Sequence, residues 1–232
     1  MDLQQQPRNQ VQEQEQEQEQ EQEQEQEQQQ QQQEGHSADA ALDARVRAAQ
    51  AAFYTQHAKR QFFAKNTQKF QCAEHVLSSC SFEDLMRQTC HTLTPRADGT
   101  PRLHFYYPRF KTFASTSIYG RVIDYVIAFV QATLATSPTG HFEYHVSLES
   151  FTVTAAHRYK DLVAQFSDVC FQRNTGFSEH LDGLYLYHVP SCGQQVAQLL
   201  LPLIPPETRP KLKVLDKQQS QQLYPLLFSE IN

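Results

Sequence analysis

Ten histidines and five cysteines give this 232-residue chain candidate metal ligands and nucleophiles. Cys72-x-x-His75, followed by Cys80 and Cys90, has the residue types of a zinc site but an irregular spacing. The alternative is that Cys72 and His75 occupy neighbouring turns of one helix. The chain has no Gly-x-Ser-x-Gly elbow, no phosphate-binding loop and no His-Glu-x-x-His. We therefore expect no catalytic residue, no metal and no cofactor.

Charge is distributed unevenly along the chain. The formal net charge is −6, but residues 1–36 carry −9 and the rest carries +3. A small positive excess suits an anionic membrane surface and is too weak to indicate nucleic acid as a partner. The cysteines are odd in number and irregular in spacing, and no apolar leader precedes them, which indicates a reducing, cytoplasmic location. No apolar run approaches the roughly 20 residues that span a bilayer, so we expect any membrane contact to be peripheral.

The first 36 residues form a Gln/Glu-rich tail. Gln and Glu alternate from Gln12 to Gln28, and this period-2 pattern places like charges at i and i+4 of a helix and on one face of a strand. A coiled coil is the alternative, but the tail has no apolar seam to drive it. We predict a disordered tail over 1–36, a helical region over 37–94 and the main domain over 95–232.

Residues 39–71 have helical periodicity, with Leu42, Val46, Ala49 and Phe53 spaced by 4, 3 and 4. Six basic residues and no acid occur between Asp43 and Glu74. A basic amphipathic helix of this kind could lie at a bilayer interface. The alternative is that its apolar face packs on the domain, as in most amphipathic helices.

The main domain alternates strands with helices. Apolar residues recur at every second position in four stretches, which predict strands at Arg102–Tyr107, Phe142–Leu148, Leu184–Val189 and Lys211–Leu215. Helical spacing predicts helices at Ile118–Thr133, Thr154–Cys170, Val196–Leu203 and Gln218–Phe228. This order predicts an α/β fold with a small, mainly parallel sheet covered by helices. We expect a fifth strand around Arg109–Ser115.

The order of these segments resembles the CRAL-TRIO lipid-binding domain, the fold of phosphatidylinositol transfer proteins. DGTPRLHFYY resembles the family's entry strand, LYLYHVP its apolar strand ending in Asn-Ala-Pro, and LLLPLIPPETRPKL its gate and last strand. The chain departs from the family pattern at Ser147, His188 and Leu201, where the family has Asp, Asn and Lys. The resemblance implies a hydrophobic or phospholipid ligand, with phosphatidylinositol as one candidate, and transfer or sensing at membranes.

The resemblance also implies site residues. An acid before the penultimate strand and a lysine at the start of the last strand line the family's headgroup site, and these positions fall on Glu179 and Lys211. An ordinary surface acid and a strand-edge lysine are the alternative. Apolar strand and gate residues would line the pocket: Tyr106, Phe142, Tyr144, Val146, Leu184, Leu186 and Val196.

Two further interpretations remain open. The apolar residues could pack entirely against one another, as in any α/β core. In that case the chain could be a scaffold that keeps the fold and binds a protein partner without a lipid. Lipid binding predicts a cavity beside Glu179 and Lys211, whereas the scaffold predicts a closed interior.

Overall fold

The computed structural model describes residues 38–57, 65–172, 175–190, 202, 204–206 and 208–228. The chain divides into two compact units, Met1–Arg45 and Val46–Asn232. A helix over 38–56 crosses this boundary. The predicted tail over 1–36 and the predicted gate helix Val196–Leu203 lie outside the described residues, except for Pro202.

The predicted amphipathic stretch contains two helices. The first covers 38–56, and the second, α2, covers Lys65–Ser79. In the larger unit, Val46, Ala49 and Phe53 are buried. The apolar face of this part of the first helix is therefore packed inside the folded chain, and contact of the helix with a membrane stays a prediction.

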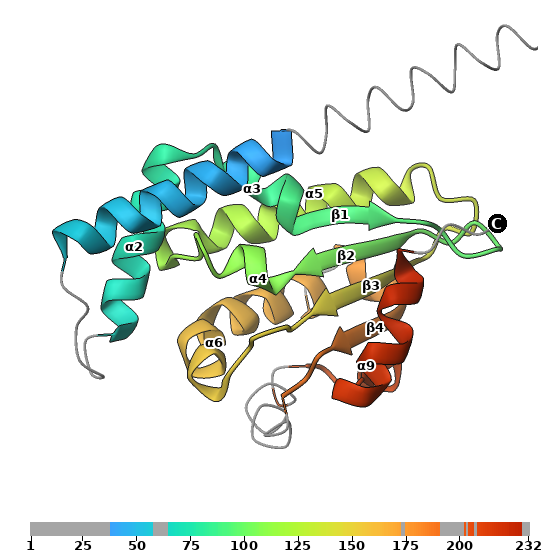
Figure 1. The fold of residues 1–232 in the computed structure, drawn as a ribbon. Helices are drawn as coiled ribbons and strands as arrows, with labels where there is room; N and C mark the ends of the chain where they lie inside the picture. Colours follow the sequence, from blue (N-terminus) through green and yellow to red (C-terminus); the bar gives the residue numbers. More distant parts are fainter. Residues whose placement is uncertain are drawn as a thin grey trace, which may run out of the picture. The chain divides into compact units, whose positions relative to one another are not determined.

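A five-stranded sheet forms the centre of the larger unit, in the order β1-β2-β3-β4-β5 (Figure 1). Strand β1 pairs antiparallel with β2, and the other neighbours pair in parallel. The strands are β1 (Cys90–Leu93), β2 (Arg102–Tyr106), β3 (Phe142–Ser147), β4 (Leu181–Tyr187) and β5 (Leu212–Val214). The α/β class and the mainly parallel sheet are thus confirmed.

The remaining described elements connect or flank these strands. The α-helices are α3 (Phe82–Thr89), α4 (Tyr107–Phe110), α5 (Tyr119–Leu134), α6 (Val153–Ser167), α7 (Phe177–His180) and α9 (Lys217–Leu223). Short 3₁₀ segments are η2 (Thr116–Ile118), η5 (Arg209–Lys211) and η6 (Pro225–Leu227), and η3 (Asp168–Gln172) is a π-helical turn.

Local chemistry sets where several of these elements begin. The Ser81 side chain accepts a hydrogen bond from the Asp84 N–H and caps the start of α3. Thr152 caps α6 in the same way. The fifth strand was predicted in the wrong place: Pro108 in the first turn of α4 makes residues 107–110 helical, and the fifth strand is β1.

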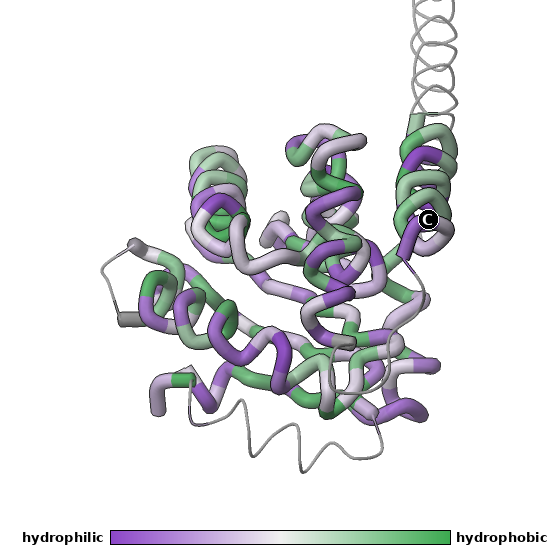
Figure 2. The backbone as a smooth tube through the Cα atoms, turned by 90° about the vertical axis from the view of Figure 1, so that its left-hand side faces the viewer, coloured by the Kyte–Doolittle hydropathy of each residue, from purple (hydrophilic) through white to green (hydrophobic). Residues whose placement is uncertain are grey.

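The sheet has two different faces. Its strands follow one another in sequence order, so right-handed crossovers place their helices on the same side. Helices α5 and α6 lie on this side, called the helix face below, and α9 lies on the other, the α9 face (Figure 1). Hydrophobic and hydrophilic residues are interspersed along the helices (Figure 2), as expected for amphipathic helices that cover a sheet.

Candidate functional site: an apolar cavity on the helix face

A cavity of about 200 Å³ lies on the helix face, between the sheet and helices α5 and α6. Strands β2, β3 and β4 form its floor, and both helices contribute to its wall. Its surface is almost wholly apolar. The described lining residues include nine aromatic side chains: Phe105, Tyr107, Phe110, Tyr144, Phe151, Tyr159, Phe166, Phe171 and Phe177.

Strand alternation and helix periodicity bring these residues together. On β3, Tyr144 and Val146 point to the cavity because alternate residues share a face. On α5, Val122 and Val126 are four residues apart and therefore lie on one side of the helix. The wall is thus a direct consequence of the period of each element.

The polar atoms near the wall include the Tyr144 hydroxyl and the thiols of Cys90 and Cys170. The Tyr144 hydroxyl is hydrogen-bonded to the Cys90 thiol, and burial raises the pKa of Tyr144 well above its ordinary value. Burial also raises the pKa of Cys90 to about 12, although the bond to Tyr144 lowers it, and burial raises the pKa of Cys170 to about 12. Both thiols are protonated at neutral pH and are therefore poor nucleophiles.

The volume of the cavity limits what could occupy it. A cavity of roughly 150 Å³ with apolar walls can hold benzene, whereas drug-sized ligands occupy roughly 300 to 1,000 Å³. At about 200 Å³, the cavity has room for one slender chain or a small ring. Both tails of a phospholipid would require it to enlarge.

The structure brings together four of the seven predicted lining residues: Tyr144, Val146, Leu184 and Leu186 all line the cavity. Tyr106 follows Phe105, which lines the cavity, so its side chain points to the α9 face. Phe142 is fully buried beside the cavity and packs edge-on against Phe177, with ring centroids 5.2 Å apart.

The seventh predicted residue, Val196, lies outside the described residues. Six of the residues that complete the wall come from the two helices, and the prediction did not include them: Val122, Val126, Tyr159, Leu162, Val163 and Phe166. On α6, Tyr159, Val163 and Phe166 are spaced by 4 and 3 residues. This helical spacing is the sequence signal that could have identified the α6 part of the wall.

Glu179 and Lys211 lie at the amino ends of neighbouring strands, on α7 before β4 and on η5 before β5. The Lys211 ammonium donates a hydrogen bond to the Ser178 carbonyl at 2.9 Å. Glu179 is exposed to solvent. The lysine therefore joins η5 to α7, and the role of the pair in headgroup binding stays a prediction.

Cys72, Cys80 and Cys90, the cysteines with the residue types of a zinc site, are all buried. Among the residues that the structure describes, no three His, Cys, Asp or Glu side chains gather as metal ligands would. Within the same ranges, no helix combines the length and apolarity needed to cross a membrane.

Comparison with known proteins gives no match to a protein-family model or to a curated protein sequence. The relationship to the CRAL-TRIO family therefore stays a prediction from the sequence.

Proposed function

We propose that this chain binds a hydrophobic small molecule, or one hydrocarbon chain of a lipid, in the cavity on the helix face. The observation that carries the proposal is the cavity itself: it is apolar, and it lies between a sheet and two crossover helices. An apolar space of this size has no polar groups to hold water, so an apolar occupant is favoured.

Exchange with a membrane would suit this chemistry. Each methylene moved from water into an apolar site gains about 0.8 kcal/mol, and a bilayer offers the same gain. Moving a chain from a bilayer to this cavity is therefore close to neutral, which would let the chain take up and release its ligand. The sequence resemblance to a lipid-transfer family supports the same function.

The test is organic extraction of the purified full-length protein, followed by mass spectrometry of what it carries. Leu186 is half-buried and lines the cavity, so Leu186→Trp would fill it. Leu226 is 62% exposed, and Leu226→Trp is the matched control. We expect a hydrophobic molecule near one per chain in the wild type and the control, and at least a fivefold lower amount in Leu186→Trp.

Folding has to be checked in parallel, because overpacking costs stability. Circular dichroism of each variant serves this purpose, and Val163→Phe, on α6, fills the cavity from the other side. Equal ligand content in all four proteins would place the ligand elsewhere. A wild type that carries nothing and takes nothing from vesicles would favour the scaffold function.

A further inference from the structure

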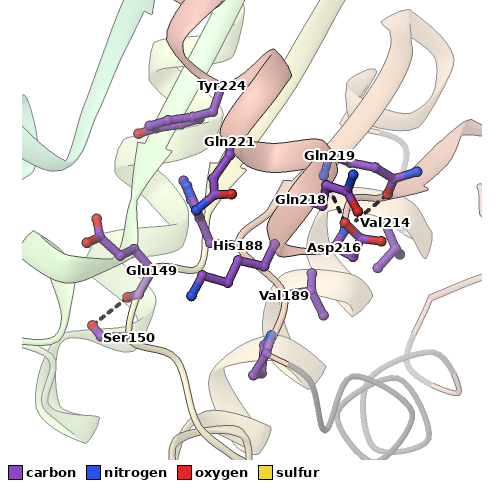
Figure 3. Close-up of a pocket in the computed structure, with 12 residues that line it drawn as sticks. Glu149, Ser150, His188, Val189, Val214, Asp216, Gln218, Gln219, Gln221 and Tyr224 are labelled. Atoms are coloured by element: carbon purple, nitrogen blue, oxygen red, sulfur yellow. Dashed lines mark hydrogen bonds between the residues drawn. The ribbon is translucent and has the colours of Figure 1, made fainter.

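A second hollow, of about 870 Å³, lies at the carboxyl ends of the parallel strands and shares no described lining residue with the cavity. The loops after β3, β4 and β5 and the helix α9 form its walls. Glu149 and Ser150 lie on one side and Asp216 and Gln218 on the other, with His188 between them (Figure 3). This hollow is called the carboxyl-edge groove below. In parallel α/β sheets, ligands commonly bind at this edge.

Two loops of the groove are held in an unfavourable conformation. Ser150 (φ 61°) and His188 (φ 57°) are the two non-glycine residues with positive φ in the described part of the chain, and both line the groove. Such conformations persist where the surrounding structure enforces them, and they cluster at ligand sites.

Hydrogen bonds enforce both conformations. The His188 N–H donates to Ser220 Oγ at 2.7 Å, and its Nδ1 lies 3.3 Å from Ser147 Oγ. The Lys111 ammonium donates to Ser150 Oγ at 2.5 Å. The loops are therefore fixed from α9, from β3 and from the segment after α4, and the groove is formed before any ligand arrives.

The floor of the groove is partly apolar. Tyr224 is half-buried, and its hydroxyl is 3.0 Å from His104 Nε2, which fixes the ring. Val189 and Pro190 extend this apolar surface. Such a floor can take the C–H face of a ligand, as an aromatic side chain with a polar tip commonly does.

The rim presents polar groups with unused bonding capacity. Among described residues, the side chains of Lys217, Gln218 and Gln221 have no hydrogen-bond or ion-pair partner, and all three line the groove. Each amide both donates and accepts. This combination matches a ligand whose groups also do both, as hydroxyls do.

Charge narrows the ligand class further. The Glu149 carboxylate would repel a bound anion, and the Lys217 ammonium would repel a bound cation. The Asp216 carboxylate accepts from the Gln219 N–H at 2.8 Å and caps α9, so it is already engaged. The described lining thus carries two carboxylates and one ammonium, a net formal charge of −1 that disfavours a phosphate, and no three metal-ligating side chains gather among the described residues.

We propose that the carboxyl-edge groove binds a neutral polyhydroxylated small molecule, a sugar or a cyclic polyol, with its C–H face on Tyr224 and its hydroxyls on Gln218, Gln221 and Glu149. This proposal is independent of the ligand in the apolar cavity, because the two sites share no described wall residue.

The test is saturation-transfer NMR and calorimetry on the full chain with myo-inositol, glucose and maltose, and with inorganic phosphate as the anionic probe. We expect at least one polyol to bind and phosphate not to bind. Gln221→Ala should weaken that binding at least fivefold, because it removes a donor and an acceptor from the rim. Gln222→Ala is the matched control, since this neighbouring exposed glutamine of α9 does not line the groove.

Three outcomes would overturn the proposal: no polyol binds the wild type, phosphate binds instead, or Gln222→Ala weakens binding as much as Gln221→Ala. Leu186→Trp separates the two sites, because its larger side chain should displace the ligand from the apolar cavity and leave polyol binding unchanged. Loss of polyol binding in Leu186→Trp, with the fold intact, would also contradict independent sites.

Discussion

The α9 face of the sheet contains buried histidines. His104 is 1% exposed, with its Nδ1 3.1 Å from His91 Nε2. His145 is 2% exposed, 3.0 Å from the Tyr187 hydroxyl and 3.3 Å from a Glu143 carboxylate oxygen. Burial lowers the pKa of both rings below the ordinary value, because it penalises the charged form most strongly. These residues therefore make the fold sensitive to acid.

The neighbours of Glu143 offset the effect of burial on the pKa of its carboxyl. Burial raises the pKa of its carboxyl, but the hydrogen bonds from His145 and Tyr185 and the charge of Arg102 hold it below its ordinary value overall. A buried carboxylate is retained where several donors surround it. The strand alternation that places Glu143 and His145 on one face also places the apolar Tyr144 and Val146 on the other.

His104 should make the free energy of unfolding depend on pH. Burial, then His91 and His145, lower its pKa from 6.5 to about 3. As the pH falls, His104 is protonated near pH 6.5 in the unfolded chain but only near pH 3 in the folded chain. The free energy of unfolding therefore decreases as the pH falls through this window. Between pH 6.5 and 5, we expect His104→Gln to remove about 2 kcal/mol of the wild type's loss, at about 1.36 kcal/mol per pH unit.

Urea unfolding at pH 8, 6.5 and 5 measures this dependence. His104→Gln also loses the contact with Tyr224, so the slope with pH, and not the absolute stability, is the readout. His157, exposed on α6, supplies the control variant His157→Gln, which should keep the wild-type slope. An unchanged slope in His104→Gln would mean that this histidine is not the acid-sensitive group.

At the element scale, strands that alternate clearly were the easiest to predict. Phe142–Leu148 was predicted and Phe142–Ser147 is observed, because apolar and polar residues alternate throughout. β1 was missed because its four residues are too short to show a period. The last helix was predicted to run to Phe228, but Pro225 interrupts it and the observed α9 ends at Leu223.

The same reasoning explains which parts of the two sites could be found from sequence. The cavity floor uses alternate residues of β3 and β4, and the family resemblance implied four of them: Tyr144, Val146, Leu184 and Leu186. The carboxyl-edge groove depends on positive φ at Ser150 and His188. Neither residue type signals this conformation, because tertiary hydrogen bonds impose it.

Gly99, in the turn before β2, occupies a position that requires glycine. Gly99 has φ +83°, and a Cβ built on it would lie 2.7 Å from Pro138 Cγ. Gly99→Ala should therefore destabilise the fold by about 1 to 3 kcal/mol. Gly120, in α5, would meet nothing within 4 Å, so Gly120→Ala should stabilise by up to about 1 kcal/mol through helix propensity. Urea unfolding of both variants checks the two signs, and a neutral Gly99→Ala would refute the steric argument.

At the scale of the whole molecule, the sequential strand order separates two kinds of chemistry. The crossover helices gather on one face and enclose the apolar cavity, while polar side chains occupy the other face and the carboxyl edge. One sheet thus carries an almost wholly apolar cavity and a groove of mixed polarity, without a shared wall among the described residues. Ligands of the two could then be tested separately on one protein.

The size of the cavity leads to a prediction about chain length. With 1-alkanols from butanol to decanol, each added methylene should raise affinity about fourfold, equivalent to about 0.8 kcal/mol, until the cavity is full. Beyond that length, further methylenes gain nothing unless the helices move, so affinity should level off. Calorimetry on the extracted protein measures the series. Leu186→Trp should bring the plateau to shorter chains, and Leu226→Trp should leave it where the wild type has it. If affinity levels off at the same chain length in all three proteins, the alkanols bind outside the cavity. A larger side chain in the cavity wall would otherwise reduce the longest alkanol that fits.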